Sequence, residues 1–174
     1  MDAIEVLMKR RSVRKFTGEQ ITDEQLKTIL DAGLYAPTGM GRQPWKFVVV
    51  QGDENHKTIS DLNRKGRGGP EGADAYYNAP TIVLAFGDTE SPLYDYDVAL
   101  ALGNMMNAAY AVGVGSCWIH GEKQMFELPE GKALMEKWGV PANFVGVGSI
   151  ILGYADGEYP APRERKENTV VYFK

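Results

Sequence analysis

Apolar residues recur along the chain at the two spacings that distinguish helices from strands. Where they return every three or four residues we predict helices, at residues 2–9, between Thr22 and Pro37, and at 53–62, 95–112 and 130–138. Where they run consecutively and are β-branched we predict buried strands, at residues 45–51, 81–87, 116–119 and 144–154. No repeat or linker interrupts this series, so residues 1–174 are expected to form one domain.

Local signals set several boundaries. Thr22 and Gln25 form a capping box that starts the second helix, which stops before Pro37 because the residue preceding proline avoids helical angles. Residues 36–44 and 64–72 are rich in Gly and Pro, and we predict loops there, the second of them mobile. Residues 95–112 are apolar on nearly every face, which predicts a helix buried on all sides.

The C-terminal tail, residues 155–174, differs from the rest of the chain. Pro160 and Pro162 predict an extended path over a surface, and residues 169–173 then carry a strong strand signal. Such a strand either returns to its own sheet or adds to the sheet of a partner subunit. We favour the partner, because the proline-stiffened segment is poorly suited to a tight return.

Composition excludes several classes of function. The formal net charge of −4 disfavours nucleic-acid binding, and no apolar stretch reaches the roughly 20 residues that a membrane span needs. Charges occupy the N-terminal positions where an export signal needs apolar residues. One cysteine excludes an internal disulfide, and two histidines give no metal-ligand spacing, so we expect a cytoplasmic protein without a metal.

Basic residues nevertheless cluster at two places. Five of the seven residues 9–15 are Lys or Arg, and Arg163, Arg165 and Lys166 lie close together near the C-terminus. On charge alone, the cluster at residues 9–15 is best interpreted as a solvated helix C-terminus, where cations complement the helix macrodipole. The alternative is an anion site, because guanidinium groups match phosphate oxygens and Ser12 adds a hydroxyl donor.

Two further segments contain residues suited to binding a flat ring. Residues 36–45 combine Pro37 with the small residues Thr38 and Gly39, and Gln43 offers an amide to the edge of a heterocycle. Residues 113–121 follow the long apolar helix, but they lack both the Rossmann and the P-loop spacing. A phosphate-bearing cofactor would therefore be held by side chains, which favours the anion-site alternative.

Other reactive residue types are given structural roles. Cys117 lies among apolar neighbours on a predicted buried strand, where a thiol is a poor nucleophile. His120 has no nucleophile to serve as a base. Tyr76 and Tyr77, like Tyr94 and Tyr96, are interpreted as surface or interface packing, with a pocket wall as the alternative.

Three separated motifs, RRSVRKF, APTGMGRQPWKFVVV and AYAVGVGSCWI, together resemble the nitroreductase family in order and spacing across nearly the whole chain. The resemblance implies an α+β fold, in which helices wrap a central, mainly antiparallel sheet and the C-terminal strand is exchanged between subunits. It further implies a homodimer, with two FMN molecules in the interface and the tail wrapped around the partner.

The resemblance also assigns cofactor contacts. The phosphate contacts correspond to Arg10, Ser12, Arg163 and Arg165, with Arg11 in the same run, and Arg14 corresponds to the basic residue beside N1 and the C2 carbonyl of the flavin. Pro37, Thr38 and Gly39 correspond to a loop that reaches the flavin from the partner subunit, with Gln43 close by. Ile119, His120 and Gly121 fall where the backbone faces the flavin N5.

The implied activity is hydride transfer from NADH or NADPH through flavin N5 to a nitroaromatic, a quinone or a flavin, with ping-pong kinetics and no catalytic side chain. Alternatives are a non-catalytic FMN storage or sensing protein, a reductive dehalogenase, and an enzyme that consumes its flavin. In one respect the sequence departs from longer members, which carry an Asn and a Lys before the second strand. Whether Asn63, Arg64 or Lys65 replaces them is left open.

Overall fold

A computed structural model describes residues 2–174, and its centre is a four-stranded antiparallel sheet of order β1-β2-β4-β3. The strands are β1 (Trp45–Gln51), β2 (Thr81–Asp88), β3 (Gly115–Ile119) and β4 (Phe144–Gly153). The helices are α1 (Ala3–Lys9), α2 (Asp23–Leu34), α3 (Asp53–Arg67), α4 (Tyr94–Ala111), α5 (Glu122–Glu127) and α6 (Pro129–Lys137), with a 3-10 turn η1 at Gly39–Gly41. The α+β fold with an antiparallel sheet is thus confirmed.

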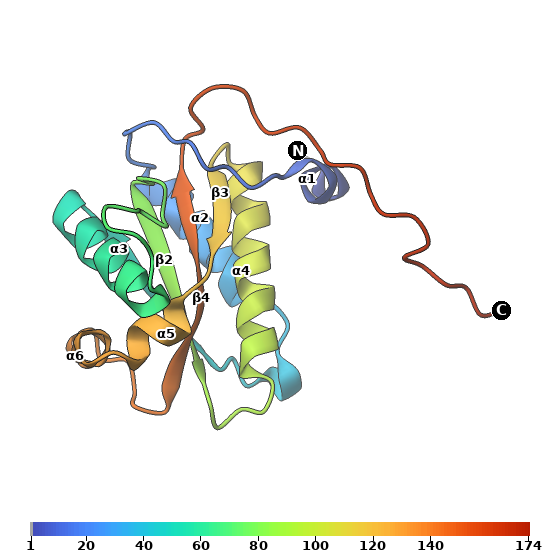
Figure 1. The fold of residues 1–174 in the computed structure, drawn as a ribbon. Helices are drawn as coiled ribbons and strands as arrows, with labels where there is room; N and C mark the ends of the chain where they lie inside the picture. Colours follow the sequence, from blue (N-terminus) through green and yellow to red (C-terminus); the bar gives the residue numbers. More distant parts are fainter. Residues whose placement is uncertain (1) are drawn as a thin grey trace.

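Helices cover both faces of the sheet (Figure 1). Strand β2 shows why, since its side chains alternate between two apolar cores with the period of two that a strand imposes. Ile82 and Leu84 pack with residues of α3, α5 and α6, whereas Val83 and Ala85 pack with residues of α2 and α4. A fully buried central strand therefore connects two helical layers.

Several predicted elements have the expected bounds, including the capping box of α2, in which the Gln25 N–H donates to Thr22 Oγ1 at 3.1 Å. The prediction of a loop at residues 64–72 was wrong in its first half, because α3 continues to Arg67 and ends at the left-handed Gly68. Gly66 explains the continuation: a Cβ there would lie 2.7 Å from the Met125 nitrogen, so glycine allows α3 to pack directly on α5.

Two predictions about burial were also wrong. Tyr76 is not at a surface or interface but fully buried beneath β3 and α5. The predicted all-round burial of the long helix fails in the single chain, because Tyr96 and Leu100 of α4 are 66% and 50% exposed. No helix within residues 2–174 is both long enough and apolar enough to cross a bilayer.

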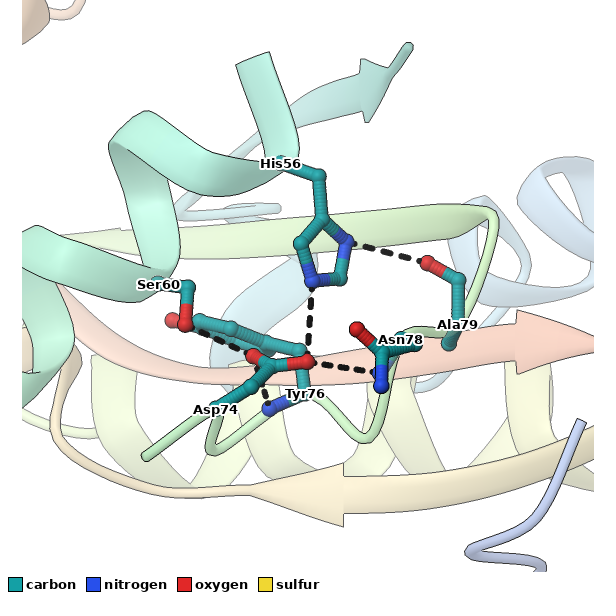
Figure 2. Close-up of polar contacts among 6 residues, drawn as sticks. All are labelled: His56, Ser60, Asp74, Tyr76, Asn78 and Ala79. Carbon is teal, nitrogen blue, oxygen red and sulfur yellow. Dashed lines mark hydrogen bonds and ion pairs between the residues drawn. The ribbon is translucent and has the colours of Figure 1, made fainter. Parts of the chain in front are cut away.

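The segment that carries Tyr76 is held by Asp74 (Figure 2). Asp74 Oδ1 accepts hydrogen bonds from Ser60 Oγ at 2.7 Å and from the Tyr76 N–H at 2.9 Å. Its Oδ2 accepts from the Asn78 N–H at 2.6 Å and from His56 Nε2 at 3.0 Å. These bonds offset the conformational cost of the left-handed backbone at Asn78 (φ 52°) and fix Tyr76 in the core.

The tail leaves the body of the molecule after β4 and runs past α1 (Figure 1). Val171 and Phe173 are fully exposed, and residues 169–173 form no strand within the single chain. Their pairing with a partner's sheet stays a prediction. Strand β1 is an edge strand and so presents one unpaired side to which a further strand can add.

Candidate functional site

The basic N-terminal run lies against the beginning of β3. Arg10 caps the C-terminus of α1, with its N–H bonded to the Val6 carbonyl. The chain then becomes extended: Ser12 bridges Ser116 of β3 in parallel, and the Val13 N–H donates to the Ser116 carbonyl at 2.9 Å. This short pairing fixes the position of the run on the edge of the sheet.

Arg10 and Arg11 have different surroundings. Arg11 Nη1 donates to the carbonyls of Met8 and Arg10, both at 2.7 Å, so this side chain serves the helix end as the charge pattern alone suggested. The Nη1 atom of Arg10 and the Nε atom of Arg11 are buried and have no hydrogen-bond partner within residues 2–174. Buried guanidinium donors without acceptors fit an anionic ligand.

The start of the tail reaches this same run. Tyr159 Oη accepts a hydrogen bond from the Arg11 N–H at 2.8 Å, and its ring lies 5.4 Å from that of Tyr110 on α4. Beyond it, Arg163 and Arg165 are exposed, and Arg165 donates to the Arg163 carbonyl. The structure therefore brings the Tyr159 side chain at the start of the tail to the basic run, whereas Arg163 and Arg165 are exposed in the single chain.

The Pro37 loop lies at the opposite end of α4. The Gly39 N–H donates to both carboxylate oxygens of the buried Asp97, at 3.0 and 3.3 Å, in the first turn of α4. The basic run lies instead near the C-terminal end of α4 (Figure 1). From Asp97 to Ala109 an α-helix rises about 18 Å, so one chain does not bring the loop and the arginines together.

The third predicted segment forms the turn from β3 into α5. The His120 carbonyl accepts hydrogen bonds from Asn63 Nδ2 at 3.2 Å and Arg67 Nη1 at 3.3 Å. In a trans peptide the next N–H points the opposite way, so these donors orient the Gly121 N–H. Gly121 has φ 124°, and a Cβ there would lie 2.6 Å from Arg67 Cδ, which excludes any larger residue without rearrangement.

Arg67 is a candidate site residue that the sequence did not reveal, and Asn63 was one of three candidates between which the sequence did not decide. Of the three candidates left open, only Asn63 contacts the β3–α5 turn, whereas Arg64 pairs with Asp61 and Lys65 with Glu130. The i,i+4 spacing of residues 63 and 67 places them on one helix face. This spacing would have been informative only if residues 64–67 had been predicted as helical, and they were predicted to form a loop.

A buried carboxyl lies directly after this turn. Glu122 is fully buried, and its Oε1 accepts hydrogen bonds from Ser149 Oγ at 2.6 Å and Tyr76 Oη at 3.3 Å. Burial raises the pKa of Glu122 to about 7, although the bonds from Ser149 and Tyr76 and the charge of Arg67 act in the opposite direction. The carboxyl can therefore gain or lose a proton near neutral pH.

Comparison with known proteins identifies the family of the chain. Residues 7–154 match the Nitroreductase family. Over 165 residues the chain is 32% identical to a protein of Archaeoglobus fulgidus with the provisional name NADH dehydrogenase/NAD(P)H nitroreductase, covering 90% of this chain and 87% of the relative. A nitroreductase of Bacteroides fragilis, crystallised with bound FMN, superposes with a TM-score of 0.89 over all of both chains at 31% identity. An FMN-dependent nitroreductase of Clostridium difficile has a TM-score of 0.85 at 29% identity, covering 98% of this chain and 99% of the other.

Proposed function

Because the chain belongs to the nitroreductase family, we propose that it is an FMN-dependent oxidoreductase that passes electrons from NADH or NADPH to a small acceptor with ping-pong kinetics. The acceptor class is a nitroaromatic, a quinone or a flavin. The observation that carries the proposal is the buried Nη1 atom of Arg10, which has no hydrogen-bond partner in the described part of the chain. It belongs to the same run as Ser12 and as Arg11, whose N–H bonds Tyr159 at the start of the tail. Those donors fit the phosphate of FMN.

Each segment of the site then has a task. Arg10 and Ser12 bind the phosphate, and Arg163 and Arg165 complete its contacts once the tail is placed on a partner. Arg11 supports them by holding the end of α1. Arg14 is exposed, with no hydrogen-bond partner among the described residues, so its charge is free to lie beside the pyrimidine part of the ring.

FMN supplies the redox chemistry when it is bound, and the protein supplies position and field. Ile119, His120 and Gly121 form the wall of the site on the N5 side. Asn63 and Arg67 hold the His120 carbonyl and so direct the Gly121 N–H towards the ring. No side chain is assigned a role as acid or base towards the substrate.

A second copy of the chain supplies the remaining contacts, with Pro37, Thr38, Gly39 and Gln43 reaching the flavin of the partner. The distance of about 18 Å along α4 supports this, because it keeps that loop from the arginines of its own chain. Exposed apolar side chains support it further: Ile4, Leu7 and Met8 of α1 are 60%, 58% and 70% exposed. A seven-residue helix with a single buried side chain is stabilised by covering such a surface.

In the same dimer, residues 155–174 wrap the partner and residues 169–173 add to an edge of its sheet. The open side of β1 is suited to receive them. The tail would then bury Val171 and Phe173, which no contact covers in the single chain.

Anaerobic reduction tests the activity. Purified protein is expected to carry FMN, to lose its yellow colour with NADH or NADPH, and to regain it when a nitroaromatic or a quinone is added. FMN that stays oxidised with both nucleotides would indicate storage or sensing. Protein that neither contains nor binds FMN would overturn the proposal as a whole.

A further inference from the structure

The buried carboxyl of Glu122 is linked by hydrogen bonds to the turn that faces the flavin. Asn63 Nδ2 donates both to the His120 carbonyl and, at 3.1 Å, to Tyr76 Oη. Since Tyr76 Oη accepts from Asn63, its own proton is free to go to Glu122 Oε1, which Ser149 also donates to. A continuous set of contacts therefore runs from the His120–Gly121 peptide to the carboxyl.

The other oxygen of this carboxyl, Oε2, is buried and has no hydrogen-bond partner within residues 2–174. An ionised carboxylate with one unsatisfied oxygen in the core is costly, and the neutral acid is less so. This geometry leaves Glu122 sensitive to any further negative charge placed nearby.

The charges around Glu122 are few. From α3 it is faced by Arg67, whose Nη1 bonds the His120 carbonyl, and from the loop before β2 by the phenol of Tyr76. Strand β4 contributes only the neutral Ser149, and the neighbouring Lys123 and Glu127 of α5 and His120 at the end of β3 are exposed. Within residues 2–174 no cation bonds the carboxyl directly, so little positive charge near Glu122 compensates for an electron pair added to the flavin.

We propose that Glu122 is a redox-linked protonation site, which takes up one proton from solvent when the FMN bound above His120–Gly121 is reduced and releases it on reoxidation. The inference rests on the proposed function. A hydride from NADH or NADPH brings two electrons and one proton to the ring, and the nucleotide leaves oxidised. The added negative charge disfavours a buried carboxylate close by, so Glu122 takes the second proton and becomes the neutral acid.

The pH dependence of the flavin midpoint potential tests this. In the wild type the slope above about pH 7 should be about twice that of Glu122→Gln, since two protons rather than one accompany two electrons there. The two proteins should have equal potentials at the acid end, where both side chains are neutral. At the alkaline end the variant should have the higher potential. Glu127→Gln, an exposed carboxyl on the same helix, is the control and should behave as wild type.

A second variant should shift the pH range of the steep slope without abolishing it. Ser149→Ala deletes the strongest donor to Glu122 Oε1, so the steep region of the curve should shift to higher pH. In the wild type, the reduced-minus-oxidised infrared spectrum at neutral pH should gain a protonated-carboxyl band that Glu122→Gln lacks. The shift in Ser149→Ala and the presence of the band in the wild type can both be measured even if Glu122→Gln does not fold.

The outcomes separate the inference from the function beneath it. FMN that binds and is reduced, with parallel potential curves in wild type and Glu122→Gln and no carboxyl band, overturns the role of Glu122 alone. A protein that binds no FMN overturns the proposed function first.

Discussion

The Nε2 atom of His56 lies 3.0 Å from Oδ2 of Asp74, while the other ring nitrogen of His56 lies 3.1 Å from the Ala79 carbonyl (Figure 2). Both partners are acceptors, so both contacts are hydrogen bonds only when the imidazole carries two protons. The bond to Asp74 raises the pKa of His56 against the lowering effect of burial. Burial raises the pKa of Asp74, but bonds from His56, Ser60 and two backbone N–H groups together lower it well below its ordinary range.

This pair makes stability depend on pH in a defined direction. The pKa of His56 is raised in the folded state, so its contribution is complete below about pH 6.5 and is lost as pH rises through the raised value. His56→Gln should lower the free energy of unfolding by about 1 kcal/mol at mildly acidic pH, and by less at alkaline pH. Urea unfolding at two pH values measures this, with the exposed Lys57→Gln as control. An equal loss at both pH values would contradict it.

Glu122 makes stability depend on pH in the same direction, because its raised pKa means that the folded state binds the proton more tightly than the unfolded chain. Stability should fall as pH rises from about 4.5, and at pH 8 Glu122→Gln should be more stable than wild type by up to roughly 3 kcal/mol. The measurement is urea unfolding of the FMN-free protein across this range. A stability difference that does not change with pH would show that Glu122 keeps its charge in the core.

Arg10→Gln tests the phosphate contact. Removing the guanidinium, whose Nη1 atom is buried, should weaken FMN binding by about 10- to 100-fold, because hydrogen bonds to charged groups are the strong ones. Riboflavin, which lacks the phosphate, should bind the variant and the wild type equally. Flavin fluorescence quenching measures both affinities, and Lys9→Gln, an exposed neighbour paired with Glu5, serves as the matched control. Equal losses for FMN and riboflavin would place Arg10 away from the phosphate.

Gly121→Ala tests the turn between β3 and α5. The new Cβ would meet Arg67 Cδ at 2.6 Å and adopt φ 124°, so a loss of about 1–3 kcal/mol in stability is expected. Flavin reduction by NADH should also slow, because the His120–Gly121 peptide loses its orientation. Gly103→Ala on α4 has nothing within 4 Å of its Cβ, so it should be neutral or stabilising. Comparable losses in the two variants would remove the special role of residue 121.

Local signals in the sequence were sufficient for most of the fold. The capping box at Thr22 and the β-branched runs of β1, β2 and β4 gave these elements close to their observed bounds. The α3 helix was cut short because Gly66 is a helix-weakening residue by propensity, and only its contact with α5 explains why it is there. Tyr76 was predicted at a surface or interface for a related reason. Its burial depends on Asp74, which is held by Ser60 and His56 of α3, and these contacts between segments are not visible in the local sequence.

The predicted site residues divide in the same way. Arg10 and Ser12 are two residues apart in one motif, so placing them near each other required no knowledge of long-range contacts. Arg67 was missed, and Asn63 could not be chosen over Arg64 and Lys65, because their contacts with His120 join segments more than fifty residues apart. Burial of Glu122 was likewise invisible, since a charged residue early in a short helix is ordinarily solvated.

The central claim is that each flavin site needs two copies of the chain, the arginines coming from one and the Pro37 loop from the other. The mass of the FMN-loaded protein under native conditions tests it most directly. We expect a species of two chains with two FMN molecules, and no single chain that retains FMN on dilution. A stable monomer carrying one FMN would contradict it.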